Sequence, residues 1–395
     1  MVSNGRSRGR ASENPDRRRD GGTMTAPARD ASARSSAPRR ARAGTLGAVL
    51  DPRRNAYNLI RLVMAAFVVV WHSFPLTGHD IGLEPVRQLA SRLPVDVFFA
   101  ISGYLIAMSW SRTPSVVAFL RARVLRIFPA FWVCLVLTAG VFAPVALLLR
   151  GVPAPDGFVG DAVSYVVRNA ALRVWQFDIA GTPLGTPLEG AWNGSLWTLG
   201  WEFTCYLGVL VLGVLGLLRS RWALPVAYVA CTAGVLASSY GDVHNWYLTN
   251  GSRFGIVFVA GAIIWRWRDS LPVRGWLLAV AALVVAVSST LPDYGVVAAL
   301  PLAYLALAAG ALLKQPALSI RTDISYGTYI YGFPLQQLLA TAGLASLGVP
   351  LFALLSLAIT FAAAAASWHL VEKPTMKFKR RRPVPGPTDP VSTVA

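Results

Sequence analysis

Long apolar segments separated by short polar ones alternate along most of the chain. Ten of them approach or exceed the roughly 20 residues that a helix needs to cross a bilayer. The pattern therefore predicts an all-α polytopic membrane protein with about ten transmembrane helices. The expected helices span 58–76, 94–111, 127–149, 196–218, 222–239, 253–267, 275–291, 296–313, 324–343 and 349–370.

The two ends of the chain differ from this pattern. Residues 1–50 combine Arg, Ser, Gly, Pro and Asp with few large apolar side chains, so they cannot bury a core. We expect a disordered basic cytoplasmic tail over 1–50, a membrane domain over 55–376, and a basic, Pro-rich cytoplasmic tail over 377–395. The first apolar segment lacks a small-residue cleavage site and is expected to stay as a helix. Translation can start at Met1 or at Met24.

The distribution of charge predicts an orientation. The formal net charge is +18, and 13 of the 37 basic residues precede residue 55. With both ends inside the cell, the remaining loops and the C-terminal tail hold seventeen basic residues inside and six outside. This positive-inside bias places both termini in the cytoplasm and the protein in the cell inner (plasma) membrane. The sequence contains no folded basic module, so the expected partners include membrane lipids but no nucleic acid.

The first apolar segment contains only two ionisable side chains, Arg61 and His72. Eleven residues of helix raise His72 roughly 16 Å above Arg61, about half of a hydrocarbon core. Ionisable groups at that depth commonly mark a substrate path or a reaction centre. A buried imidazole stays neutral and can accept a proton, although an interhelical hydrogen bond is the structural alternative for His72. Snorkelling to lipid phosphates explains Arg61 equally well.

Polar side chains also mark the next two segments. Asp96 is expected to cap the second helix or to support a site, and Ser102 lies before Gly103 in a pair small enough for close helix approach. Arg121, Arg123 and Arg126 precede the third helix on the cytoplasmic side. Forked guanidinium donors suit phosphate groups, whereas positive-inside anchoring is the alternative explanation for these arginines.

Glu202 lies inside the fourth apolar segment. Trp197 suits the outer interface, and Tyr206 lies one turn after Glu202 on the same helix face. A carboxylate in hydrocarbon needs a partner, so we expect Arg61, His72 or an acceptor hydroxyl close to Glu202. Glu202 and His72 enter from opposite faces and are expected to meet near the midplane.

Other features are weaker. The longest external connection, 150–195, is expected to line an acceptor site or to cap the bundle. Three cysteines lie inside apolar segments without disulfide or metal-ligand spacing, so they are expected to be small buried side chains, and no metal site is expected. The remaining histidines lie in loops or near a helix end, as solvated or interfacial groups do. These residues are Cys134, Cys205, Cys231, His79, His244 and His369.

Taken together, these stretches resemble the acyltransferase 3 family of integral membrane enzymes. Members of this family O-acylate sugars of polysaccharides, peptidoglycan, glycolipids or macrolides. The resemblance covers approximately residues 55–376, with six motifs in the family's order. They are Arg61-x10-His72, Val95–Ile106, Arg121–Trp132, Ser195-Leu-Trp-Thr-Leu with Glu202, Ile324-Ser-Tyr-Gly-Thr-Tyr-Ile-Tyr331 and Glu372-Lys373-Pro374.

The resemblance implies a mechanism. An acyl-coenzyme A, taken as acetyl-coenzyme A, would be a co-substrate on the cytoplasmic side, with no permanently bound cofactor. Its phosphates would contact the three arginines of the third motif, and Arg61 would position the pantetheine end. His72 would act as general base on a sugar hydroxyl or carry the acyl group, and Glu202 would orient or stabilise the imidazolium. The implied acceptor or supporting residues are Asp96, Ser102, Trp197, Tyr206, Ser325 and Tyr326.

One departure from the family concerns the ninth apolar segment. Many members carry His where this chain has Gly332, which concentrates the proton chemistry on His72. A glycan or glycolipid transporter or flippase that uses His72, Arg61 and Glu202 as a relay is the main alternative, and a membrane scaffold or sensor is another. The sugar acceptor, the acyl length and the oligomeric state are left open.

Overall fold

The computed structural model describes residues 42–51, 54–241, 243, 245–318 and 322–378. Within these residues every regular element is a helix, and the β contacts are isolated bridges. A helix lies at each of the ten positions that hydropathy indicates, so the all-α polytopic fold is confirmed. They are α2 (Tyr57–Leu76), α3 (Glu84–Arg112), α4 (Val116–Leu137) with its continuation, α7 (Trp197–Val214), α8 (Ala223–Tyr240), α9 (Trp246–Trp267), α10 (Gly275–Ser288), α11 (Tyr294–Leu312), α12 (Ser325–Thr341) and α13 (Val349–Ser367).

Shorter elements complete the fold. A π-helical turn joins α4 to α5, and another joins α13 to α14, so that both helices continue beyond the turn. Two further helices, α1 and α6, lie outside the predicted positions, and short 3-10 turns end α7 and α12 and follow α11. The bounds are α1 (Leu46–Val49), η1 (Thr138–Phe142), α5 (Ala143–Arg150), α6 (Phe158–Asn169), η2 (Leu217–Arg219), η3 (Pro316–Leu318), η4 (Leu344–Leu347), η5 (Trp368–Glu372) and α14 (Lys373–Lys377).

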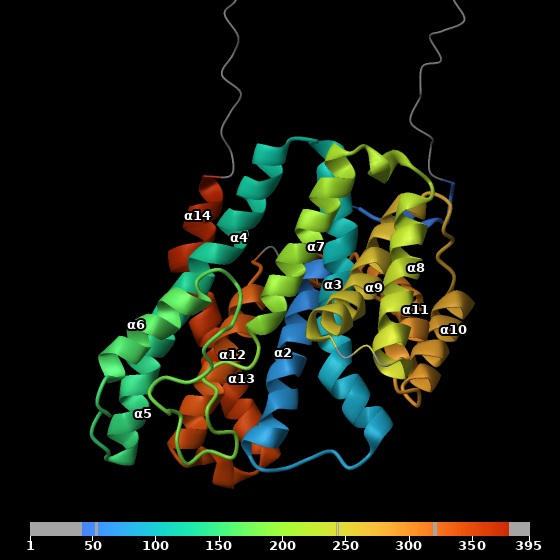
Figure 1. Ribbon diagram of the computed structural model, residues 1–395. Coiled ribbons are helices and arrows are strands. Elements are labelled where there is room, and N and C mark those ends of the chain that lie inside the picture. The colour runs from blue at the N-terminus through green and yellow to red at the C-terminus, as the bar shows by residue number, and fades with distance from the viewer. Residues whose placement is uncertain (1–41, 52–53, 242, 244, 319–321, 379–395) are drawn as a thin grey trace, which may run out of the picture. The chain divides into compact units, whose positions relative to one another are not determined.

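Eight helical runs in the described part of the chain are long and apolar enough to cross a membrane. The other two predicted helices are shorter, with 14 residues in α10 and 17 in α12. The count of ten crossings therefore stays a prediction. The first and last described residues lie at the same end of the bundle, here called the terminal end (Figure 1). The α2–α3 connection lies at the opposite end, called the loop end. An even number of crossings requires this arrangement of the ends.

The centre of the bundle is built on a close contact between α3 and α9. A Cβ atom at Gly103 would lie 1.9 Å from the carbonyl oxygen of Phe258, and one at Gly261 would lie 1.9 Å from that of Ala100. Only glycine allows the two backbones to approach this closely. α12 is buried over almost its whole length between α2 and α13, beside which it packs (Figure 1).

Two expectations about element boundaries are wrong, and the long connection 150–195 contains a helix that was not predicted. Residues 42–50 belong to the predicted disordered tail, yet Leu46 is fully buried and its N–H donates to the carbonyl of Leu271. α3 begins at Glu84, because its first turns alternate polar and apolar positions instead of forming one apolar run. The connection 150–195 contains the amphipathic helix α6. Residues 1–41 and 379–395, where the rest of the two predicted tails falls, lie outside the described residues.

Candidate active site

His72 lies near the loop end of α2 and not at its middle. It follows Tyr57 by fifteen residues and precedes Leu76 by four, so it stands roughly 22 Å along a helix of about 30 Å. The depth of His72 relative to the membrane midplane stays a prediction. The ring of His72 is half-buried and packs edge-on against Phe333, with ring centroids 4.9 Å apart.

Beside His72 lies a small cavity of about 140 Å³, here called the His72 chamber. Three hydroxyl and carbonyl groups in its wall bond to one another. Tyr329 donates to the carbonyl of Ser195 at 3.0 Å, and its hydroxyl lies 2.5 Å from Thr198 Oγ1. The residues that line the chamber are Val68, Trp71, His72, Ser91, Val95, Gly194, Ser195, Trp197, Thr198, Arg253, Phe254 and Tyr329.

A larger hollow of about 820 Å³ opens beside the chamber, here called the aromatic groove. The segment before α7 forms one wall, and α7 and α9 form the other. Gly194 and Trp197 line both the groove and the chamber, so the two spaces adjoin. Among the groove residues are Arg173, Trp175, Phe177, Trp197, Trp201, Phe203, Thr204, Trp246 and Tyr247. Residues of 150–195 therefore line a groove in which an acceptor has room to bind, and the predicted role of this connection stays a prediction.

Glu202 has partners other than those expected. Its Oε1 accepts hydrogen bonds from Ser102 at 2.6 Å and from Tyr206 at 2.5 Å. Among the described residues, no hydrogen bond or ion pair joins Glu202 to His72 or to Arg61. The expected direct contact between Glu202 and His72 is therefore not formed among the described residues. The predicted proximity of Tyr206 to Glu202 is confirmed.

The three arginines of α4 do not converge on one point. Arg121 donates to the carbonyl of Phe378 at the terminal end. Arg123 donates to Ser109 Oγ at 2.8 Å and lies over the rings of Phe119 and Tyr206. Residues three apart share a helix face whereas residues two apart do not, so Arg126 lies nearer Arg123 than Arg121 does. The single phosphate clamp that the sequence suggested is not present as a cluster.

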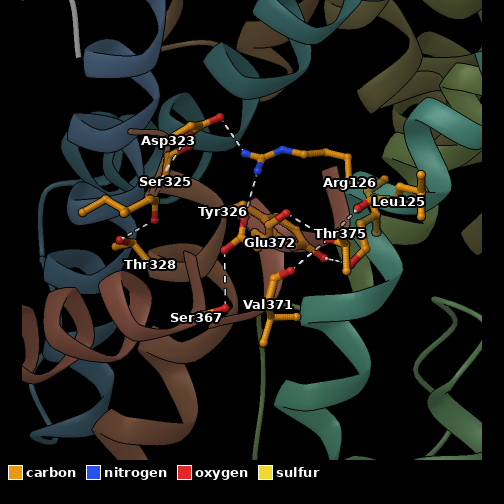
Figure 2. Close-up of polar contacts among 12 residues, drawn as sticks. Leu125, Arg126, Asp323, Ser325, Tyr326, Thr328, Ser367, Val371, Glu372 and Thr375 are labelled. Atoms are coloured by element: carbon orange, nitrogen blue, oxygen red, sulfur yellow. Dashed lines mark hydrogen bonds and ion pairs between the residues drawn. The ribbon is translucent and has the colours of Figure 1, made fainter. Parts of the chain in front are cut away.

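Arg126 instead joins a buried group of charges, here called the ion network (Figure 2). Its guanidinium bonds Asp323 at 2.5 Å and Glu372 at 2.8 Å, while Arg61 bonds Asp323 at 2.8 Å. The π-helical turn η5 holds Glu372 at this position, and such turns are frequent at functional sites. Burial alone raises the pKa of Asp323, but the two guanidinium groups outweigh it and hold the pKa at about 2.

The motif residues of α12 surround the same network. Ser325 Oγ donates to Asp323, and Tyr326 donates to the carbonyl of Ile127 at 2.8 Å. The Arg126 guanidinium lies 5.6 Å from the centre of the Tyr326 ring. Ser325 and Tyr326 therefore support the ion network and lie away from the groove. Asp323 was missed from the sequence, where a single acid in a short polar connection carries no distinctive signal.

Two aromatic rings connect the ion network to the His72 chamber. The Arg61 guanidinium lies 5.6 Å from the centre of the Phe98 ring, and Phe98 packs edge-on against Tyr329 at 5.8 Å. Because Tyr329 lines the chamber, these contacts run from the terminal half of α2 to its loop end.

The described histidines other than His72 are exposed, as expected, and one of the three cysteines is fully buried. His79 is exposed and pairs with Thr77, and His369 is exposed in η5. Cys134 is buried, whereas Cys205 and Cys231 are only partly so, and all three are free thiols. In the described ranges no three His, Cys, Asp or Glu side chains gather as a metal-binding group. The prediction for His244 lies outside the described residues.

Asp96 proves to be an interior residue of α3 and not a helix cap. It is almost completely buried, and one carboxylate oxygen accepts from the hydroxyl of Tyr294. The N-cap expectation fails because the helix begins twelve residues earlier, at Glu84.

The amino-acid sequence matches known proteins over most of its length. A family model described as an acyltransferase domain, acyltransferase 3, matches residues 54–369. An O-acetyl transferase of Shigella phage Sf6 is 28% identical over 333 residues, which cover 81% of this chain and 96% of the relative. Nodulation protein 10 of Rhizobium leguminosarum bv. viciae is 29% identical over 358 residues, 82% of this chain and 94% of the relative. No solved structure matches.

Proposed function

Because the chain belongs to the acyltransferase 3 family, it is a membrane O-acyltransferase, and we propose that it acylates a sugar hydroxyl with acyl-coenzyme A as the donor. The acyl group is acetyl in the simplest case, as the name of the phage relative suggests. The acceptor is a glycan, a glycolipid or a glycosylated metabolite. The membrane is the cell inner membrane, with both termini in the cytoplasm.

The observation that carries this proposal is the position of His72. It stands in the wall of a small chamber, and the adjoining aromatic groove opens the same region to a larger molecule. A neutral imidazole at this position is suited to remove a proton from the hydroxyl group of a bound acceptor. An acceptor and a thioester that fill the chamber would displace water from it, which favours transfer of the acyl group over hydrolysis of the thioester.

The donor side lies at the terminal end. The proposed phosphate contacts are Arg121 and Arg123. Arg126 is already paired with two carboxylates, so it is not assigned a phosphate contact. Arg121 lies at the end of the bundle, so the nucleotide part of coenzyme A would reach it first. Arg61 pairs with Asp323 and lies over Phe98, and in this proposal it borders the route of the pantetheine arm toward the chamber.

In the proposed reaction, His72 both removes a proton from the acceptor and returns it to the leaving group. The acceptor oxygen forms a bond to the acyl carbon while His72 takes the hydroxyl proton. The carbon–sulfur bond of the thioester then breaks, and the protonated imidazole returns the proton to the departing thiolate. Glu202 acts at a distance in this scheme, because it orients Tyr206 and Ser102 and does not touch His72.

The proposal is tested with the purified full chain in nanodiscs. Acetyl-coenzyme A that carries a labelled acetyl group is incubated with glycans and lipids extracted from the cells that produce the protein. We expect label in a carbohydrate fraction as an alkali-labile ester. Label that never leaves acetyl-coenzyme A, or that appears only as acetate, contradicts the proposal. Transport of an unmodified glycolipid between leaflets would instead favour the flippase alternative.

A further inference from the structure

Two polar groups in the wall of the His72 chamber have no partner in the protein. Ser195 is 2% exposed, and its Oγ is buried without a hydrogen bond. Arg253 lines the chamber from α9, and within the described residues no hydrogen bond or ion pair engages its guanidinium. Its close aromatic contact is with the ring of the adjacent Phe254, at 4.8 Å. A buried hydroxyl without a partner, such as Ser195 Oγ, is rare because leaving it unbonded is costly, whereas Arg253 is only partly buried.

The surroundings of Arg253 include a second cavity and a buried carboxyl group. Behind the chamber lies a second cavity of about 80 Å³, lined by Arg92, Asp96, Arg253 and Tyr294 among others. Arg253 lines both cavities, so it stands in the wall between them. The second oxygen of Asp96 is buried without a bond, and Asp96 attracts Arg253 electrostatically. Asp96 thus lies near Arg253 without occupying its N–H groups.

The chemistry of the chamber indicates what these donors are for. Acyl transfer passes through a tetrahedral intermediate in which the former carbonyl oxygen carries negative charge. That oxygen needs donors fixed in place before the reaction, in a site from which water is excluded. The other hydroxyls of the wall already have partners: Thr198 and Tyr329 bond to each other and to the Ser195 carbonyl, and Ser91 donates to the carbonyl of Gln88 at 3.2 Å. Ser195 Oγ is the hydroxyl of the wall that has no partner among the described residues. The wall also holds the uncharged indole N–H groups of Trp71 and Trp197, and Arg253 supplies its guanidinium donors.

We propose that Arg253 and Ser195 Oγ form the oxyanion-binding site of this enzyme, in the same chamber as His72. This inference rests on the proposed acyl transfer. When the acceptor oxygen attacks, the carbonyl electron pair moves onto the carbonyl oxygen, which Arg253 and Ser195 bind. When the carbon–sulfur bond breaks, the pair returns to the carbonyl and the thiolate leaves with the proton from His72. Arg253 is therefore a catalytic residue and Asp96 a positioning residue.

The test compares Arg253→Gln, Arg253→Lys and Ser195→Ala with the wild type in nanodiscs. Two rates are measured with labelled acetyl-coenzyme A: transfer to the cell extract, and slow hydrolysis to acetate without acceptor. Both reactions pass through an oxyanion, so Arg253→Gln should lower both rates by about 100- to 1,000-fold, with little change in the KM for acetyl-coenzyme A. Arg253→Lys should recover part of the loss because it keeps the charge.

The matched control is Arg92→Gln, because Arg92 also interacts with Asp96 but does not line the His72 chamber. It should reduce the rates several-fold at most, and thermal melting identifies any variant that fails to fold. If Arg253→Gln raises only the KM for the acceptor and leaves hydrolysis unchanged, Arg253 recognises the acceptor and the inference is wrong. Normal rates in both assays also overturn it. A wild type inactive with acetyl-coenzyme A overturns the proposed function and this inference together.

Discussion

At the scale of single residues, charged side chains inside the apolar helices bond to groups from distant parts of the chain. Arg61 and His72 stand out because they interrupt an apolar run, and Glu202 stands out for the same reason. Their partners come from distant parts of the chain, and Asp323 follows Arg61 by 262 residues. Pairing across such separations depends on helix packing, which no local pattern encodes. The spacing of Glu202 and Tyr206 was predictable because both lie on one helix face.

Asp323 gives the most direct test at this scale. Its ion pairs with Arg61 and Arg126 are largely buried, so Asp323→Asn removes the carboxylate that pairs with Arg61 and leaves Arg126 paired with Glu372 alone. Removing one partner of a buried pair costs about 3–5 kcal/mol. We expect a marked fall in the thermal midpoint in detergent. Asp80→Asn is the matched control, because the Asp80 side chain is 69% exposed, and it should have no measurable effect.

The same residue predicts a pH dependence. The pKa of Asp323 in the folded chain is about 2, below its ordinary value of 3.8. Its stabilising contribution is therefore complete above about pH 4 and is lost as the pH falls toward 2. The thermal midpoint of the wild type should fall across this window, and the fall should be smaller in Asp323→Asn. Equal slopes for both proteins would refute the assignment.

At the scale of elements, hydropathy located the helices and missed their irregularities. The π-helical turns η1 and η5 fall inside apolar runs that look regular in sequence, yet η5 sets the position of Glu372. The start of α3 was misplaced by ten residues because its first three turns are only partly apolar. The motif containing Gly103 did predict a close helix approach, and the contact with α9 is the reason for the glycine.

Gly103 supplies the prediction for this scale. In Gly103→Ala the new Cβ would meet the Phe258 carbonyl at 1.9 Å, so α3 and α9 must separate. Overpacking of this kind costs typically about 1–3 kcal/mol, and it also shifts Arg253 relative to His72. Thermal melting and the transfer rate should both decline. Gly208→Ala is the control, since a Cβ there meets nothing within 4 Å, and it should be neutral or slightly stabilising.

At the scale of the whole molecule, the proposed donor and acceptor sides are separated along the length of α2. The ion network includes Arg61 in the terminal half of α2, and the His72 chamber, which adjoins the groove, lies near its loop end. Phe98 and Tyr329 lie between the network and the chamber. Composition and charge predicted the membrane fold and an orientation for it. They contained no information about the groove, because its walls combine the segment before α7 with α9, and only folding brings these together.

The groove carries a prediction about the acceptor. Indole rings offer a flat apolar face and one N–H donor, which suits a sugar ring with its C–H and hydroxyl groups. Trp201→Ala should therefore raise the KM for the acceptor by about 10-fold or more, while the KM for acetyl-coenzyme A stays unchanged. Trp222→Ala, an exposed tryptophan outside the groove, is the control. A change in the KM for acetyl-coenzyme A alone would contradict the assignment of the groove to the acceptor.

The central claim is that acyl transfer from the donor to the acceptor takes place in the chamber beside His72. The most direct measurement compares transfer of labelled acetyl by the wild type and by His72→Ala, both shown to be folded by thermal melting. We predict that the variant loses at least about 100-fold of the transfer rate, as expected when a general base is removed, and still binds acetyl-coenzyme A. A folded His72→Ala protein that transfers acetyl groups at close to the wild-type rate would contradict the account.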